Sequence, residues 1–179
     1  MSDGTATGQR LVRALLGGVI MGVLGVLAGQ MTGFLPLGGP RVLADPCRTV
    51  PVADLVPGND GPRGKGGRAS AKCEAGTPGS APYTASLSIE LEKSPSSEAT
   101  EGHHARACAA LAGLGDVTGP PELGDAACAA TDQGLVPSAT VHVRFGRVRL
   151  TVRYTCEGKD PAILEGQAVE AARRVVASP

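Results

Sequence analysis

Two adjacent histidines and a cysteine are the residues in this sequence whose types and spacing could support chemistry. They lie in the stretch EGHHARACAALAGLG, residues 101–115. On a helix, His104 and Cys108 would stand one turn apart on one face, where they could grip the same metal ion. Zinc sites need three or four protein ligands, however, and no third ligand stands nearby in the sequence. We therefore expect no cofactor, and we keep a metal-dependent or redox site at His103, His104 and Cys108 as the alternative hypothesis.

The sequence contains no recognisable motif of an enzyme active site. There is no G-x-S-x-G nucleophile turn, no H-E-x-x-H zinc motif and no glycine-rich phosphate loop. The 17 Lys and Arg residues are balanced by 17 Asp and Glu residues, so no net charge points to a nucleic acid. We expect a protein that has no catalytic residues and does not bind nucleic acid.

A β-hairpin is the clearest local structure, in ATVHVRFGRVRLTVRYT, residues 139–155. Apolar side chains alternate along it, first on odd positions and then on even ones: Val141, Val143 and Phe145, then Val148, Leu150, Val152 and Tyr154. The change of parity falls at Gly146-Arg147, which predicts a two-residue type II′ turn with Gly146 as its first residue. In this register the apolar residues of both strands share one face.

The other face of this hairpin is basic and is the predicted anion-binding surface, with His142, Arg144, Arg149 and Arg153. The register places Arg144 opposite Arg149, and like charges at such positions destabilise a sheet. Carboxylates of a neighbouring strand could compensate, since Glu90 and Glu92 alternate with apolar residues in SLSIELE. The alternative is an external anion, supplied by an envelope protein, an anionic polymer or lipid headgroups.

A helix is predicted to close the chain, in KDPAILEGQAVEAARRVVASP. Asp160 is its N-cap, and Pro161 occupies the first helical position. Apolar residues form a stripe along one side, at Leu164, Ala168, Ala171 and Val175. Glu165 near the start and Arg173 and Arg174 near the end suit the helix dipole.

The strongest single signal lies near the start of the chain. Residues 14–37 carry no charge, and as a helix of about 36 Å they would cross a bilayer. Arg10 and Arg13 precede this run, so the positive-inside rule places residues 1–13 in the cytoplasm. The expected location is the plasma membrane, crossed once, with the C-terminal domain outside the cell beyond a linker at 38–46. The alternative is a cleaved signal peptide and a secreted protein.

Outside the cytoplasm cysteines are expected to form disulfides, and a core with two Phe, two Tyr and no Trp needs such cross-links. An internal repeat aligns the segment that begins at Cys47 with the one that begins at Cys108, and Cys73 with Cys128. If the repeat is real, the pairs are Cys47–Cys73 and Cys108–Cys128, and Cys156 is left over. The alternative is that Cys156 pairs with Cys108 or Cys128.

The pattern ADPCRTVPVADLVPG…AKCEAG…YTASLSIELE resembles that of a known group of proteins. It is similar to the small cysteine-paired lipoproteins and membrane-anchored envelope proteins of actinobacteria, whose function is unknown. The matching positions are Asp45, Pro46, Cys47, Leu55 and Cys73, with a strand near 84–92. The resemblance implies a cysteine-paired fold of strands with a final helix, and an envelope location.

Together these features predict an α+β protein with an N-terminal transmembrane helix and a small disulfide-braced ectodomain. Its antiparallel sheet is expected to pack on helices, and two related half-repeats would span 47–107 and 108–179. The expected function is a non-enzymatic binding or structural module of the bacterial cell envelope.

Overall fold

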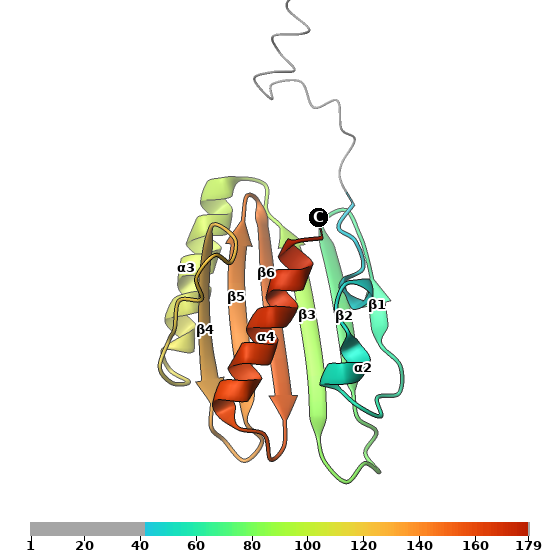
Figure 1. The fold of residues 1–179 in the computed structure, drawn as a ribbon. Helices are drawn as coiled ribbons and strands as arrows, with labels where there is room; N and C mark the ends of the chain where they lie inside the picture. Colours follow the sequence, from blue (N-terminus) through green and yellow to red (C-terminus); the bar gives the residue numbers. More distant parts are fainter. Residues whose placement is uncertain (1–41, 179) are drawn as a thin grey trace, which may run out of the picture. The chain divides into compact units, whose positions relative to one another are not determined.

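An antiparallel sheet of six strands forms the centre of the fold (Figure 1). The computed structural model describes residues 42–178. The order of the strands across the sheet is β1 (Arg63–Lys65), β2 (Ser70–Gly76), β3 (Ala85–Lys93), β6 (Val148–Cys156), β5 (Ser138–Phe145) and β4 (Ala126–Asp132). The α+β class and the antiparallel sheet predicted from the sequence are therefore confirmed.

Helices pack on both faces of this sheet. On one face α4 (Pro161–Val176) lies over β4, β5 and β6, and η1 (Pro46–Arg48) and α2 (Val52–Leu55) extend the cover toward β2 (Figure 1). On the other face α3 (Ser97–Leu111) lies mainly over β4 and β5. The domain therefore has three layers at its β4–β5 end, where helices cover both faces of the sheet.

The hairpin predicted at 139–155 is formed by β5 and β6. Its paired residues are Phe145 with Val148, Val143 with Leu150, and Val141 with Val152. Gly146 has a φ of 58°, the positive value that the first residue of a type II′ turn requires and that favours glycine. The register inferred from the change of parity is correct.

Both long helices begin at capping residues that the local sequence supplies. In α4 the Asp160 carboxylate accepts a hydrogen bond of 2.8 Å from the Ala162 N–H, and Pro161 follows the cap as predicted. In α3 the Ser96 hydroxyl accepts a bond of 3.1 Å from the Ala99 N–H. The four stripe residues predicted for the closing helix are buried against the sheet: Leu164, Ala168, Ala171 and Val175.

Tyr154 connects three elements in the core. Its side chain is fully buried, and its hydroxyl donates a hydrogen bond of 2.7 Å to the Leu55 carbonyl at the end of α2. The hydroxyl also accepts a bond of 2.9 Å from Lys159 Nζ, which bonds Gln167 on α4 as well. Burial raises the pKa of the Tyr154 phenol, so it stays protonated and can donate.

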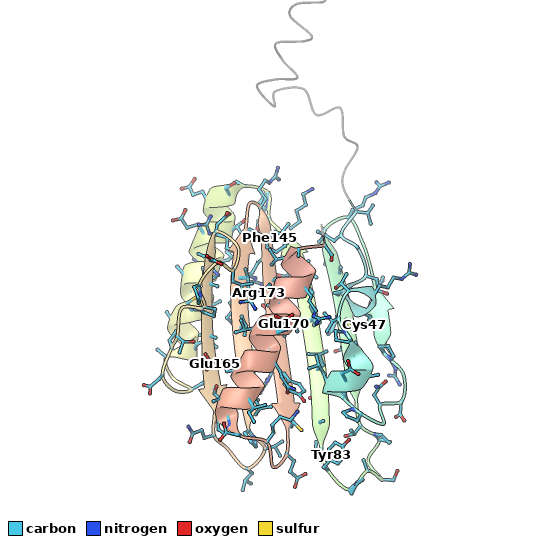
Figure 2. All side chains as sticks on the ribbon, in the orientation of Figure 1. Cys47, Tyr83, Phe145, Glu165, Glu170 and Arg173 are labelled. Carbon is cyan, nitrogen blue, oxygen red and sulfur yellow. A yellow bond between two sulfur atoms is a disulfide. The ribbon has the colours of Figure 1, made fainter. Side chains whose placement is uncertain are left out.

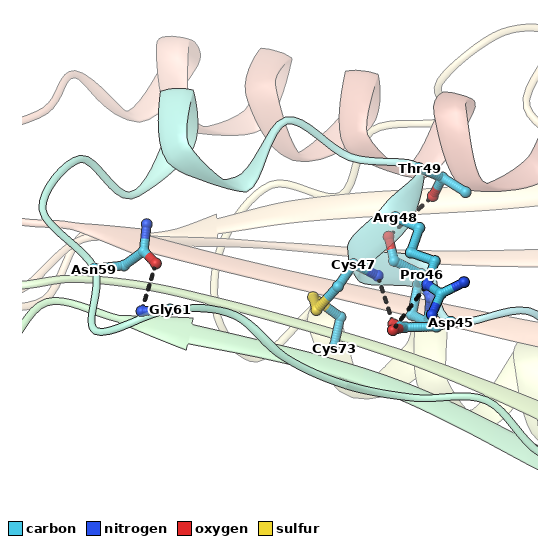
Figure 3. The surroundings of a disulfide bond; sticks show 8 residues. All are labelled: Asp45, Pro46, Cys47, Arg48, Thr49, Asn59, Gly61 and Cys73. Atoms are coloured by element: carbon cyan, nitrogen blue, oxygen red, sulfur yellow. Dashed lines mark hydrogen bonds and ion pairs between the residues drawn. A yellow bond between two sulfur atoms is a disulfide. The ribbon is translucent and has the colours of Figure 1, made fainter.

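One disulfide joins the first described segment to the sheet. Cys47, in η1, is bonded to Cys73, in β2 (Figure 3). The Asp45 carboxylate accepts a hydrogen bond of 2.9 Å from the Cys47 N–H and caps this turn of helix. The cap and the disulfide together hold η1 against the sheet.

A second disulfide joins α3 to the edge of the sheet, between Cys108 and Cys128 in β4. Cys156, at the end of β6, is a free and buried thiol. Of the pairings that the sequence left open, the structure therefore contains the two that the repeat implied.

The two halves suggested by the repeat are not separate structural units. Their boundary at 107/108 falls inside α3, and strands of both halves form one continuous sheet. Although α3 follows β3 in the chain, it packs on β4 and β5 of the second half. Without the other half, the apolar side chains of each half's strands would be exposed to water. Residues 42–178 therefore form one unit.

The predicted anchor at 14–37 and the linker at 38–46 lie wholly or partly outside the described residues. Within 42–178, no helix has both the length and the apolar character needed to cross a membrane.

Candidate functional site

A histidine and two cysteines meet where α3 packs on β4. His104 Nε2 lies 3.4 Å from Cys108 Sγ, and the ligand atoms of His104, Cys108 and Cys128 all lie within 4.8 Å of one another. The His104 side chain is only 7% exposed, whereas His103 points to solvent. Cys128 of β4 is the third member of this cluster, which the sequence did not place near His104, and its sulfur is bonded to that of Cys108.

His104 has few partners for a buried imidazole. Its Nδ1 has no hydrogen-bond partner among the described residues, and its Nε2 contacts the disulfide sulfur of Cys108. Burial, helped by the charges of Arg144 and Arg149, lowers the pKa of His104. The ring is therefore neutral at pH 7, with a nitrogen lone pair available.

A second histidine stands beside this cluster. His142 pairs with Cys128 across β4 and β5, and its Nδ1 lies 3.0 Å from Thr151 Oγ1. Burial is the main cause that lowers the pKa of His142 to about 4, and Arg149 and His104 add to the effect. His142 is consequently neutral at pH 7 and adds no positive charge to the basic face.

Two arginines of the basic face, Arg144 and Arg149, have ion-pair partners inside the domain. Arg144 stands opposite Arg149, as the register predicted. Carboxylates flank this pair on its two outer sides, since Arg149 pairs with Glu92 of β3 and Arg144 Nη1 lies 3.8 Å from Asp125 Oδ2. Of the two arrangements that the sequence left open, the structure therefore contains internal carboxylates beside both arginines, although the buried Arg144 Nε has no hydrogen-bond partner among the described residues.

Two further residues of that face differ from the expectation. Glu90 bonds Lys72 at 2.9 Å rather than an arginine, because Lys72 lies directly opposite it on β2. Arg153 is exposed and has no ion-pair partner among residues 42–178. On the predicted anion surface, Arg153 is thus the guanidinium without an ion pair among the described residues, while Arg144 and Arg149 are both paired.

A groove on the opposite side of the sheet was not predicted. It lies between α4 and the segment 112–121, and we call it the α4 groove. Two hollows of about 430 and 560 Å³ form it and share the walls Thr118, Ala162 and Glu165. Segment 112–121 is fixed there because Thr118 pairs with Ala129 at the outer edge of β4.

Glu165 is the polar centre of the α4 groove (Figure 2). Its carboxylate accepts a hydrogen bond of 2.6 Å from the Thr118 hydroxyl and one of 3.3 Å from the Thr131 hydroxyl. Leu114, which lines the groove, is 47% exposed and adds an apolar side chain to its wall. From the sequence Glu165 suited the helix dipole, and no local signal joined it to residues 34 and 47 positions away.

Comparison with known proteins gives one structural likeness. No protein-family model matches the chain, and no curated protein matches it in sequence. The extracellular domain of PknH from Mycobacterium tuberculosis is similar at a TM-score of 0.47 and 10% identity, over 78% of each chain. A TM-score of 0.47 is too low to assign a function, so the proposals for this chain rest on its own residues.

Proposed function

We propose that this chain is a non-enzymatic binding module on the outer side of a bacterial membrane, anchored by residues 14–37. Two disulfides support the location, because such bonds form and persist in oxidising compartments. The α4 groove is the observation that supports binding. A reporter enzyme that is active only outside the cytoplasm, fused after Ser178, should be active in cells; an inactive but intact fusion would contradict the location.

The dimensions and walls of the α4 groove suit a peptide segment of a partner protein. Each hollow lies within the range of about 300–1,000 Å³ typical of ligand sites. Val169 and two prolines supply apolar wall, and Glu165 supplies the carboxylate. A segment with an apolar side chain next to a cationic or N–H donor group would match both features.

Gly166 allows the α4 groove to be filled without disturbing the fold. It lies in α4 and lines the groove, and a Cβ added there meets no atom within 4 Å. The Gly166→Arg variant should therefore fold at least as well as the wild type, since arginine favours a helix more than glycine does. Gly102→Arg is the matched control, because Gly102 lies in α3 and its added Cβ meets only Arg106 Nη1, at 3.6 Å.

The test uses a displayed peptide library selected on the wild-type protein. Selected peptides should bind the Gly102→Arg variant as they bind the wild type, and should bind Gly166→Arg at least tenfold more weakly. Enriched peptides that bind Gly166→Arg equally well would place binding elsewhere. A selection without enrichment would contradict the proposed groove.

An anionic polymer is the second partner class, and exposed Arg153 is the observation that favours it. Arg153→Ser should reduce the salt-sensitive retention of the protein on anionic liposomes or cell-wall polymer. Arg48→Ser removes the same charge from η1, where the side chain is 86% exposed, and should not reduce it. Equal retention of both variants would exclude Arg153 as an anion contact.

A further inference from the structure

The distances between His104 and the Cys108–Cys128 disulfide are close to those between the ligands of a zinc site, except that the two sulfurs are bonded to each other. In a tetrahedral zinc site, a nitrogen at about 2.1 Å and a sulfur at about 2.3 Å from the metal lie roughly 3.6 Å apart. His104 Nε2 and Cys108 Sγ are already 3.4 Å apart. Cys128 Sγ completes a group whose ligand atoms lie within 4.8 Å of one another. Two zinc-bound sulfurs lie about 3.8 Å apart, so parting the disulfide is the main movement required.

The state of the His104 ring is an independent observation that points to a ligand. The side chain is more than nine-tenths buried, and its Nδ1 has no partner within the described chain. Its other nitrogen faces a disulfide sulfur, which is a weak acceptor and no donor. With the ring proton on Nδ1, Nε2 presents its lone pair toward Cys108 Sγ, in the direction from which a metal ion held by the two sulfurs would bind.

The elements that carry the three residues hold them in place without the disulfide. His104 and Cys108 stand one turn apart on α3, which packs on β4 and β5. Leu111 and Ala130 are buried beside the two cysteines and keep water from most of the cluster. Cys128 is fixed by pairing in the sheet opposite His142. Breaking the S–S bond thus leaves the ligands near their present positions.

We propose that reduction of the Cys108–Cys128 disulfide creates a Zn²⁺ site formed by Cys108, Cys128 and His104, with one coordination position left for water. Cys108 is the more exposed of the two cysteines, so a dithiol reductant attacks there. Its thiolate forms a bond to Cys108 Sγ as the bond to Cys128 breaks, and its second thiol then releases Cys108 and leaves as a disulfide. Binding of Zn²⁺ to the two thiols releases two protons.

The second disulfide is an internal control for this proposal. Among residues 42–178, the only group of three potential metal ligands of these types that lie close together is His104, Cys108 and Cys128. Cys47 and Cys73 therefore become ordinary thiols on reduction. His103, adjacent in sequence but exposed, serves as the matched control for His104.

The experiment uses the full chain in mild detergent, with Cys156→Ser to remove the remaining thiol. The protein is reduced with a phosphine, desalted without oxygen and titrated with Zn²⁺, and also with Co²⁺, whose thiolate charge-transfer absorption reports sulfur coordination. We expect one Zn²⁺ per reduced chain and none per oxidised chain. His104→Ala should weaken Zn²⁺ binding more than about tenfold, and His103→Ala should leave it unchanged.

A second measurement uses the Cys156→Ser protein with His104 in place. Alkylation followed by mass spectrometry reports which cysteines Zn²⁺ protects. Zn²⁺ should slow alkylation of Cys108 and Cys128 at least tenfold and leave the alkylation of Cys47 and Cys73 unchanged. Equal metal binding by oxidised and reduced protein, or equal protection of all four cysteines, overturns the proposal. So does a reduced chain that binds no Zn²⁺, including one that unfolds, because the proposed site is held by the fold.

Discussion

Replacing His142 with glutamine should make folding less sensitive to mild acid. The imidazole lies partly buried on β5, between Thr151 and Arg149 of β6 and His104 of α3. Burial above all lowers the pKa of His142 from 6.5 to about 4 in the folded protein. The unfolded chain therefore takes up the proton first, so the stability that the neutral ring provides is complete above about pH 6.5 and is lost as the pH falls toward 4.

The expected loss follows from these two values. At pH 5 the unfolded ring is almost fully protonated and the folded ring mostly neutral, which corresponds to about 2 kcal/mol at 1.36 kcal/mol for each pKa unit. Because solvent reaches part of the ring and screens it, we expect about 1–2 kcal/mol. The two proteins differ only at position 142, so the contributions of all other groups cancel in the comparison.

Urea unfolding at pH 7.5 and pH 5 measures the difference. The free energy of unfolding of the wild type should fall by about 1–2 kcal/mol more than that of His142→Gln between the two values. His103→Gln, which removes a histidine from the surface, should behave as the wild type does. If the wild type and His142→Gln lose the same free energy, the burial argument for His142 is wrong.

Three further experiments test the fold and its location. Tyr154→Phe should lower the free energy of unfolding by about 1–3 kcal/mol, because the buried Leu55 carbonyl loses its donor; an unchanged urea midpoint would contradict this role. Removing both Cys47 and Cys73 as alanines should cost about 3 kcal/mol, since the bond closes a separation of 26 residues, and calorimetry would detect it. If residues 14–37 are an anchor, the full chain should stay with the membranes through an alkaline carbonate wash. If they are a cleaved signal peptide, mass spectrometry should instead find a mature chain that lacks 14–37.

The sequence predicted best those elements whose pattern is repeated locally. The β5–β6 hairpin alternates with period two and changes parity at one glycine, so its register could be derived without the rest of the chain. The closing helix has its cap, its proline and its apolar stripe within one segment. The strand SLSIELE shows the same alternation, and its Glu92 does reach Arg149.

Contacts between distant segments could not be predicted in the same way. The pairing of β3 with β6 joins strands more than fifty positions apart, and no local pattern states which strand is the neighbour. That pairing decides that Glu90 faces Thr151 on one side, while β2 presents Lys72 on the other. The repeat suggested that Cys108 pairs with Cys128, but only the packing of α3 on β4 brings His104 to the same point.

The order of the strands places two features of this domain at opposite edges of the sheet. Leu43, at the start of the described chain, pairs with Gly67 beside the β1–β2 edge, while Thr118 of the α4 groove pairs with Ala129 at the outer edge of β4. Five steps between neighbouring strands, of about 4.8 Å each, put roughly 24 Å between these edges. A partner seated in the groove would therefore lie at the opposite edge of the sheet from Leu43, so the domain would hold its bound partner about one sheet width away from the point where its own chain enters.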